Sequence, residues 1–335
     1  MENKSLISVI MPFKNTAAFI GDCIQSIIDQ TETNWELIAI DDSSTDESRN
    51  IVSAFQKQDA RIRVYTNDGL GIVSGLQTAY KHAIGDFITR MDSDDLMPLE
   101  RLSIHKKTLE QNGLGHLVTA KVSFFSDEPI GAGYQQYENW LNRVCEQQLH
   151  WDEIFKECVI PSPCWMMYRL DFEKCGGFSG SDFPEDYDLT FRIWEQNMKV
   201  IGCRETLLYW REHPERTSNT DDRLKDNYFS DLKIKYFLKN CYSNRALVLW
   251  GAGNRGKELA KILLEKKIPF DWITANPSKV KKTILGIELK NFQTFNLNKD
   301  QQHIISFADT KGQEEIKTLM LKQGKTLNEG YFFFA

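Results

Sequence analysis

The strongest constraint on the fold is the alternation of two apolar patterns over the first 95 residues. Short apolar runs predict buried strands, and the stretches between them place apolar residues along one side of a helix. The expected strands are 6–11, 35–40, 61–66 and 86–91, and the expected helices are 17–30, 44–58 and 71–83. Strands that alternate with helices predict an α/β fold with a doubly wound, mostly parallel sheet.

Local signals place two helix starts. Ser44 and Glu47 have the spacing of a capping box, which predicts that the second helix begins there. Pro98 predicts the start of a further helix that stops near Gly113, because proline suits a first helical turn and glycine a C-terminal stop. Beyond it, a strand is expected at 116–125 and a helix at 187–196.

A second α/β pattern begins near Arg245. The expected strands are 246–250, 270–274 and 303–307, and the expected helices are 257–267 and 313–322. A chain of 335 residues has room for about two domains of ordinary size. We therefore divide it into a first domain over 1–221, a linking helix over 222–244 and a smaller Rossmann-like domain over 245–335.

Composition excludes several classes of protein. Hydrophobic residues make up 41% and charged residues 26%, no apolar run reaches the roughly 18 residues of a membrane helix, and the N-terminus does not resemble a signal peptide. Seven scattered cysteines without a CxxC pair favour reduced thiols over a disulfide framework or structural zinc. We expect a cytoplasmic protein; peripheral association with the inner face of the membrane stays open.

Charge is uneven along the chain. The net charge of −6 argues against a nucleic-acid partner. Residues 241–335 nevertheless carry 15 Lys and Arg against 9 Asp and Glu, so this part is +6 and the rest is −12. The basic part would suit an anionic ligand, a partner or a membrane surface, and a homodimer is compatible with the sequence.

Acidic residues follow two of the predicted strands. Asp41 and Asp42 come after the second strand, and Asp92, Asp94 and Asp95 after the fourth. Ligands of open α/β sheets bind at the carboxyl ends of the strands, so both clusters are expected at a ligand crevice. Two carboxylates spaced i and i+2 suit Mg²⁺ or Mn²⁺ bound to phosphates. The alternative is that both clusters only cap turns and helices.

A third acidic pair, Glu185–Asp186, stands at the start of a predicted helix. Carboxylates in a first turn interact favourably with the helix dipole, which is one explanation. The other is a general base that removes a proton from a substrate hydroxyl.

With these residues in place, the chain resembles family 2 glycosyltransferases of the GT-A fold. The resemblance runs in order from Ser8 to about Ser218. It is carried by SVIMPFKN (8–15), SIIDQT (26–31), LIAIDDSSTDES (37–48), AIGDFITRMDSDDLMPLERL (83–102), CGGFSGSDFPEDYDLTFRIWE (175–195) and LLYWREHPERTS (207–218). Spaced blocks in this order are far more specific than any single motif.

The resemblance implies a role for each matching residue. Asp42, Asp92 and Pro12 would bind the donor nucleotide, with Asp42 at the base and Asp92 near the ribose. Asp94 would hold a divalent cation, Mn²⁺ or Mg²⁺, on the diphosphate, and His213 matches a histidine that contacts the metal or diphosphate in some members. Asp186 would deprotonate the acceptor hydroxyl.

The implied activity is metal-dependent and inverting. It would move a hexosyl or N-acetylhexosaminyl group from a nucleotide sugar, UDP being favoured, to a saccharide or lipid-linked acceptor in bacterial surface polysaccharide synthesis. Two positions depart from the family pattern: Lys14 replaces an aromatic residue that stacks on the base, and Leu76 an arginine near the diphosphate. Both weaken the preference for UDP without removing the metal ligands or the base.

The second domain carries a glycine turn, Gly251-x-Gly253-x-x-Gly256, between a strand and a helix. This is the setting of a dinucleotide fingerprint, but the end of the next predicted strand lacks the acidic residue that would bind a ribose. The segment resembles Rossmann-like domains attached to some glycosyltransferases and nucleotide-sugar-binding domains of sugar acyltransferases. The turn would bind a phosphate or serve as a packing or dimerisation element.

Two further functions are compatible with the sequence. One is a non-catalytic nucleotide-sugar sensor or scaffold, against which the EDYDL context of Asp186 argues. The other is an NAD-dependent oxidoreductase acting through residues 245–335, against which the missing strand-end acid argues.

Overall fold

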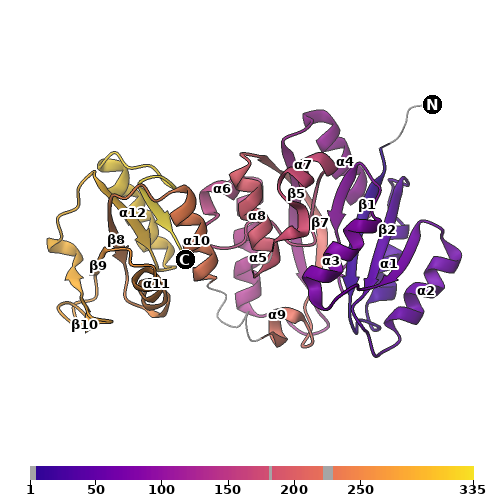
Figure 1. The fold of residues 1–335 in the computed structure, drawn as a ribbon, viewed down its shortest axis with the longest axis horizontal. Coiled ribbons are helices and arrows are strands. Elements are labelled where there is room, and N and C mark those ends of the chain that lie inside the picture. The colour runs from indigo at the N-terminus through magenta and orange to yellow at the C-terminus, as the bar shows by residue number, and fades with distance from the viewer. Residues whose placement is uncertain (1–4, 181–182, 222–228) are drawn as a thin grey trace. The chain divides into compact units, whose positions relative to one another are not determined.

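The computed structural model describes residues 5–180, 183–221 and 229–335 (Figure 1). Within these residues the chain forms two compact units. The first contains the residues up to His150 together with 159–221, and the second contains 151–158 together with 229–335. Part of the linking helix expected over 222–244 lies outside the described residues.

A seven-stranded sheet forms the centre of the first unit, in the order β3-β2-β1-β4-β6-β5-β7. Its strands are β1 (Ile7–Phe13), β2 (Trp35–Asp41), β3 (Ile62–Thr66), β4 (Phe87–Arg90), β5 (His116–Phe125), β6 (Trp165–Tyr168) and β7 (Lys199–Arg211). The first four strands run parallel, and β6 pairs antiparallel with both β4 and β5. The predicted doubly wound α/β sheet is confirmed.

Helices cover this sheet. They are α1 (Ile20–Ile28), α2 (Ser48–Gln58), α3 (Gly71–His82), α4 (Arg101–Asn112), α5 (Ala132–Glu146), α6 (His150–Glu153), α7 (Arg169–Lys174), the 3-10 turn η1 (Gly177–Ser179), α8 (Glu185–Glu195) and α9 (Thr217–Thr220). Helix α3 packs on β1 and β2, while α4 and α5 pack on β5. Apolar positions of α1, among them Cys23, Ile24 and Ile27, are fully buried, as their spacing predicts.

The predicted capping box at Ser44 is wrong. Helix α2 begins at Ser48, and its N-cap Glu47 makes no side-chain cap. Ser44 is used elsewhere, since its Oγ accepts a hydrogen bond from Asn15 N (3.1 Å) and its N donates to Asp41 Oδ1 (2.9 Å). These contacts with β2 and with the chain after β1 hold residues 44–47 in a turn, so the helix starts one turn later.

Pro98 does not begin a helix either, because α4 starts at Arg101. Leu96 exchanges two backbone hydrogen bonds with Tyr209 of β7, at 3.0 and 3.1 Å, and Met97 N donates to Ser26 Oγ. This extended backbone just before Pro98 delays the helix, and it ties the loop after β4 to β7.

The second unit is a five-stranded parallel sheet in the order β12-β9-β8-β13-β14. Its strands are β8 (Ala246–Trp250), β9 (Phe270–Thr274), β12 (Lys290–Asn291), β13 (Gln301–Ile305) and β14 (Tyr331–Phe333); β10 (Thr283–Ile284) and β11 (Ile287–Glu288) form a separate hairpin. The remaining elements are α10 (Ser230–Asn240), α11 (Asn254–Glu265), the 3-10 turn η3 (Phe292–Thr294) and α12 (Thr310–Lys322).

Two parts of the predicted domain division need correction. Residues 151–158 belong to the second unit, where the Phe155 ring stacks on Phe334 with centroids 5.3 Å apart and Asn328 Nδ2 donates to Trp151 O (2.7 Å). Helix α10 is not a free linker, because Phe237 meets Phe332 edge to face at 4.9 Å. Aromatic burial therefore recruits both segments into the second core.

All seven cysteines are free thiols. Across the part of the chain that the structure describes, none of the helices combines the length and the apolar character needed to cross a bilayer.

Candidate active site

Asp42 lies at the carboxyl end of β2, where its backbone N donates to Phe13 O. Its Oδ1 accepts hydrogen bonds from Asn67 Nδ2 (2.6 Å) and from Gly71 N (2.9 Å). The side chain is therefore fixed by the ends of β3 and α3. Asn67 was not expected to contribute from sequence, because a turn explains an Asn-Asp-Gly segment equally well.

The carboxylates of Asp41 and Asp42 have different partners. Asp41 Oδ2 pairs with Arg49 (3.1 Å) and its Oδ1 caps Ser44, so this carboxylate is committed to the protein's own turn. Asp42 Oδ2 lies 3.7 Å from Lys14 Nζ. Asp42 is thus the better candidate of the two for a ligand.

The two departures from the family pattern lie near this carboxylate and on α3. Lys14 is exposed and pairs with Asp42, so a cation stands beside the proposed base site. Pro12 is buried in β1 and lies against Gly75 of α3, where a Cβ would come within 3.0 Å of it. Leu76 is fully buried and supplies no charge to a diphosphate.

The turn after β4 carries the acidic triad. Asp92 Oδ1 accepts a hydrogen bond from Arg90 Nε at 2.8 Å, and Ser93 Oγ donates to Thr16 Oγ1 at 3.1 Å. Burial raises the pKa of the Asp92 carboxyl, and the Arg90 guanidinium opposes that rise. Arg90 was not singled out from the sequence; a cation two residues before an acidic pair at the end of a buried strand was the available signal.

Asp94 and His213 meet although they are far apart in the sequence. Asp94 Oδ2 lies 2.9 Å from His213 Nε2, and the imidazole packs on the Phe19 ring with centroids 4.5 Å apart. The buried His213 Nδ1 has no hydrogen-bond partner among the residues that the structure describes. The structure thus brings the two predicted metal-site residues together.

Asp95 connects the same turn to Arg211. Its Oδ1 accepts from Arg211 N (2.8 Å), and Arg211 Nε donates to Asp94 O (2.7 Å). Burial raises the pKa of Asp95 well above its ordinary value, and the charges of Asp94 and Asp92 raise it further. Arg211 therefore anchors the acidic turn to the end of β7.

The residues fit a divalent cation that takes some of its ligands from the protein and the others from a bound substrate. No group of three or more His, Cys, Asp and Glu side chains within residues 5–180, 183–221 and 229–335 is placed to hold a metal by itself. Mg²⁺ in phosphate-transfer sites usually takes one or two carboxylates and receives further ligands from phosphates and water. Asp94 with His213 supplies a donor set of this open kind.

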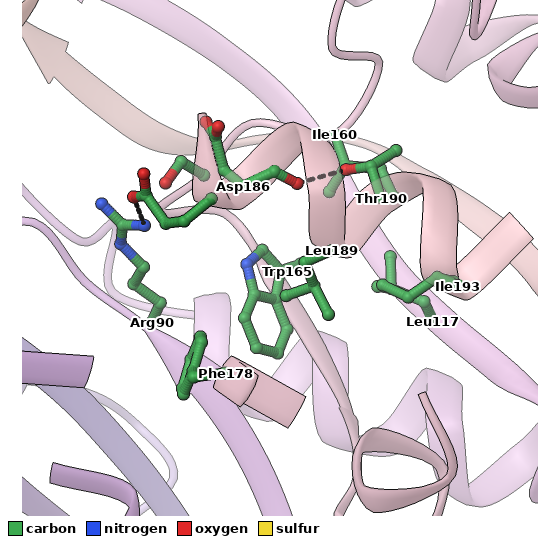
Figure 2. A pocket seen from close by; sticks show the side chains of 11 residues that line it. Arg90, Leu117, Ile160, Trp165, Phe178, Asp186, Leu189, Thr190 and Ile193 are labelled. Carbon is green, nitrogen blue, oxygen red and sulfur yellow. Dashed lines mark hydrogen bonds and ion pairs between the residues drawn. The ribbon is translucent and has the colours of Figure 1, made fainter. Parts of the chain in front are cut away.

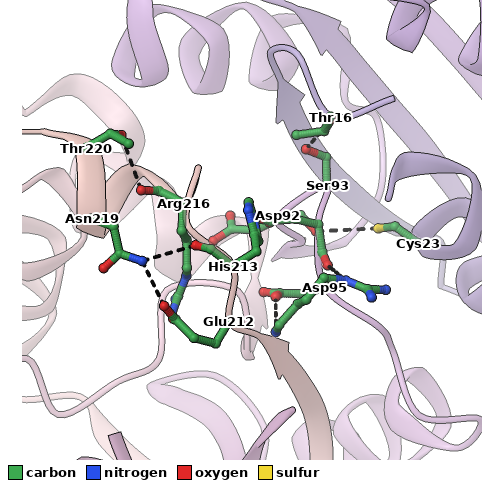
Figure 3. Close-up of polar contacts among 12 residues, drawn as sticks. Thr16, Cys23, Asp92, Ser93, Asp95, Glu212, His213, Arg216, Asn219 and Thr220 are labelled. Atoms are coloured by element: carbon green, nitrogen blue, oxygen red, sulfur yellow. Dashed lines mark hydrogen bonds and ion pairs between the residues drawn. The ribbon is translucent and has the colours of Figure 1, made fainter. Parts of the chain in front are cut away.

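The loop after β7 closes around the acidic turn (Figure 3). Arg216 pairs with Glu212 (3.2 Å) and lies over the Trp210 ring, 4.8 Å from its centroid. Asn219 Nδ2 donates to Glu212 Oε1 (2.7 Å) and to His213 O (3.1 Å). The charge of Arg216 lowers the pKa of both Asp92 and Asp95, so this loop adds a cation that the sequence analysis missed.

Asp186 occupies the first turn of α8, partly exposed, with its Oδ1 accepting from Tyr187 N (2.7 Å). Burial, followed by the neighbouring Glu185, raises the pKa of Asp186 to about 7. A carboxylate with a pKa near neutrality is a stronger base than an ordinary aspartate and is still ionised at pH 7 to a useful extent.

Figure 2 shows Asp186 at one end of a pocket that runs beneath α8. The walls are mainly apolar, and Arg90, Ser162, Glu185 and Thr190 supply polar groups. Arg90 Nη1 pairs with Glu185 Oε1 at 3.0 Å. Arg90 thereby connects the acidic turn after β4 with the start of α8.

The glycine turn of the second unit lies between β8 and α11. Gly251 has a φ of +92°, and a Cβ on Gly256 would lie 2.2 Å from Gly251 O, so both positions require glycine. No atom of the described part of the chain lies within 4 Å of such a Cβ on Gly253. Lys279 Nζ donates to Ala252 O (2.7 Å). Phosphate binding at this turn stays a prediction.

Comparison with known proteins identifies the class of enzyme. A sequence model described as glycosyl transferase family 2 matches residues 8–177, about half of the chain. The chain belongs to glycosyl transferase family 2. The match includes β1, β2, β4 and the acidic turns that follow β2 and β4.

Related glycosyltransferases cover most of the chain. The uncharacterized glycosyltransferase EpsJ of Bacillus subtilis is 36% identical over 294 residues, which span 84% of this chain and 83% of EpsJ. The Escherichia coli protein WfgD, named UDP-Glc:alpha-D-GlcNAc-diphosphoundecaprenol beta-1,3-glucosyltransferase, is 30% identical over 59% of this chain and 74% of its own length.

Solved structures share the fold of this glycosyltransferase. The Staphylococcus aureus protein TarS, crystallised with UDP-GlcNAc, aligns with a TM-score of 0.54 at 16% identity, covering 77% of this chain and 71% of that one. This likeness shows the GT-A fold, as the sequence resemblance implied.

Proposed function

We propose that this glycosyltransferase moves a sugar from a nucleoside diphosphate sugar to an acceptor hydroxyl, with a divalent cation and inversion at the anomeric carbon. The observation that carries the proposal is that one arginine bridges the two segments that bear the proposed site carboxylates. Asp92 and Asp94 follow β4, Asp186 starts α8, and Arg90 contacts both segments.

The donor side consists of two parts. Asp42, held by Asn67 and Gly71, would receive the base, with Pro12 behind it, and Asp92 would lie near the ribose. Asp94 and His213 would hold Mn²⁺ or Mg²⁺, which neutralises charge on the departing diphosphate. Arg211 would hold the backbone of this turn through its bond to Asp94 O, and Arg216 would add a positive charge near Asp92 and Asp95.

The acceptor side depends on Asp186. In its ionised form this carboxylate would accept the proton of the attacking hydroxyl while the bond to the sugar forms. A base opposite the leaving group gives a single displacement, and hence inversion. Because its pKa is about 7, Asp186 has the proton affinity that this step requires at neutral pH.

For the substrates, we infer a UDP-sugar donor and a saccharide or lipid-linked saccharide acceptor in bacterial surface polysaccharide synthesis. The name of WfgD supports both choices, and the UDP-GlcNAc held by TarS supports the nucleotide. The Lys14–Asp42 pair gives the base site a different surface from an aromatic one, so GDP and dTDP donors belong in the same screen.

The test uses the purified chain with Mn²⁺, a panel of UDP-sugars and saccharide or undecaprenyl-diphosphate-linked acceptors, followed by release of the nucleotide. NMR coupling constants of the product would report the anomeric configuration. Transfer that survives unchanged in both Asp94→Ala and Asp186→Ala would refute the mechanism. Full activity with EDTA, or retained configuration, would refute the metal dependence or the inversion respectively.

A further inference from the structure

Arg90 is a buried cation with two carboxylate partners, one two residues away in the sequence and the other 95 residues away. It is the last residue of β4, and only 7% of its surface is exposed. Its Nε lies 2.8 Å from Asp92 Oδ1, and its Nη1 lies 3.0 Å from Glu185 Oε1 (Figure 2). One guanidinium therefore touches both the turn that carries the donor residues and the helix that carries Asp186.

We propose that Arg90 is a positioning residue that holds the donor-binding turn and the first turn of α8 in one arrangement for transfer. This inference rests on the proposed function, since it assigns Asp92 to the donor and Asp186 to the acceptor.

The contact geometry requires arginine. A guanidinium presents donors in a rigid planar fork, so separate nitrogens can bind two carboxylates at once. The backbone behind the fork is also fixed, because the fully buried Arg101 donates from Nη2 to Arg90 O at 3.0 Å. A lysine at position 90 would carry the same charge as a single point, and would lose the defined orientation toward one of the two partners.

The charge of Arg90 has a second effect, on Asp186. Among the described residues, the charged groups that act most strongly on this carboxyl are Glu185 on its own helix, and Asp92 and Arg90 from the region of β4. Glu185 and Asp92 raise the pKa of Asp186, whereas Arg90 lowers it. Loss of the cation leaves two carboxylates facing Asp186, so a larger fraction of Asp186 is protonated at neutral pH.

Two substitutions distinguish the effect of the guanidinium geometry from the effect of the positive charge. In Arg90→Lys, we expect kcat to fall at least tenfold because the fork is lost, while the acidic limb of kcat/KM stays within about 0.3 pH units because the charge is kept. In Arg90→Gln, we expect a similar loss of kcat and an acidic limb about one pH unit higher or more.

Arg192→Gln is the matched control. Arg192 is a partly buried arginine on α8 that pairs with Asp188 (2.8 Å) and donates to Gly177 O (2.8 Å). Its removal should lower thermal stability and leave the acidic limb in place. A purely structural role for Arg90 would give this same result in Arg90→Gln.

A readout independent of turnover separates the inference from the proposed function. With ¹³C-labelled aspartate, the Asp186 carboxyl can be titrated by NMR and assigned by its absence in Asp186→Asn. A shift in Arg90→Gln but not in Arg90→Lys supports the charge effect even if no donor is transferred, which would contradict only the proposed function. Wild-type kcat in Arg90→Lys, or an unmoved titration in Arg90→Gln, overturns the inference; if Arg90→Gln does not fold, the kcat of Arg90→Lys decides.

Discussion

Asp186→Asn is the most informative single substitution in this enzyme. Asparagine keeps nearly the same shape but cannot accept the proton of the acceptor hydroxyl. Since a positioned general base typically contributes roughly 10²–10⁴-fold to a rate, transfer should fall by about that factor. Binding of UDP with Mn²⁺ should change little, because Asp42, Asp92 and Asp94 follow other elements of the fold.

The same substitution should stabilise the protein above neutral pH. The folded state raises the pKa of Asp186 from 3.8 to about 7, and three pH units correspond to roughly 4 kcal/mol. Because the side chain is partly exposed, water screens part of this cost, and about 2 kcal/mol is a more realistic penalty. The neutral amide would carry no such penalty, which makes Asp186→Asn a stabilising substitution at pH 8.

The sign of the pH dependence follows from linkage. Between about pH 4 and pH 7 the folded state binds the Asp186 proton more tightly than the unfolded state, so wild-type stability falls as the pH rises through this range. The advantage of the variant should therefore grow from pH 5 to pH 8. At about 2–4 °C per kcal/mol, the unfolding temperature of the first unit should rise by about 5 °C at pH 8.

Calorimetry at pH 5 and pH 8 without metal or nucleotide, together with transfer assays, would test both effects. Asp188→Asn is the control on the same helix: it removes the partner of Arg192, so stability should fall at both pH values. Retention of more than a tenth of wild-type turnover in Asp186→Asn would refute its role as base. An equal stability change at pH 5 and pH 8 would refute the argument from buried charge.

Three further outcomes are expected. Asp94→Ala should weaken Mn²⁺-dependent binding of UDP at least tenfold by calorimetry, and equal affinity with and without Mn²⁺ in the wild type would contradict this. Asn67→Ala removes a 2.6 Å hydrogen bond to Asp42 and should weaken UDP binding about tenfold, whereas unchanged affinity would remove Asp42 from the base site. Gly256→Ala places a Cβ 2.2 Å from Gly251 O and should destabilise the second unit by about 1–3 kcal/mol in chemical unfolding; an unshifted transition would show that the turn can relax.

Apolar periodicity predicted β1 to β5 of the first sheet and β8, β9 and β13 of the second, but it missed β6, β7, β12 and β14 and misplaced two helix starts. The strands at 116–125, 246–250 and 270–274 have the predicted bounds. The starts of α2 and α4 were wrong because Ser44 and Leu96 form hydrogen bonds with residues far away in the sequence, and such contacts outweigh a local preference of about 1 kcal/mol.

The residues of the candidate site were likewise predicted only in part. Strand endings placed Asp42, Asp92 and Asp94 at the carboxyl edge, since a strand's end is a local property of the sequence. Arg90 and Asn67 were missed because their importance lies in partners that only the fold brings near.

The sequence by itself determined the α/β class, the family and the identity of the acidic residues, because all three follow from local periodicity and short motifs. Tertiary structure decided which carboxylates are held by cations, that Asp94 meets His213, and that Asp186 has a pKa near 7. It also assigned residues 151–158 to the second unit. Desolvation and Coulomb interactions depend on distance in space, and the order of residues along the chain contains that distance only indirectly.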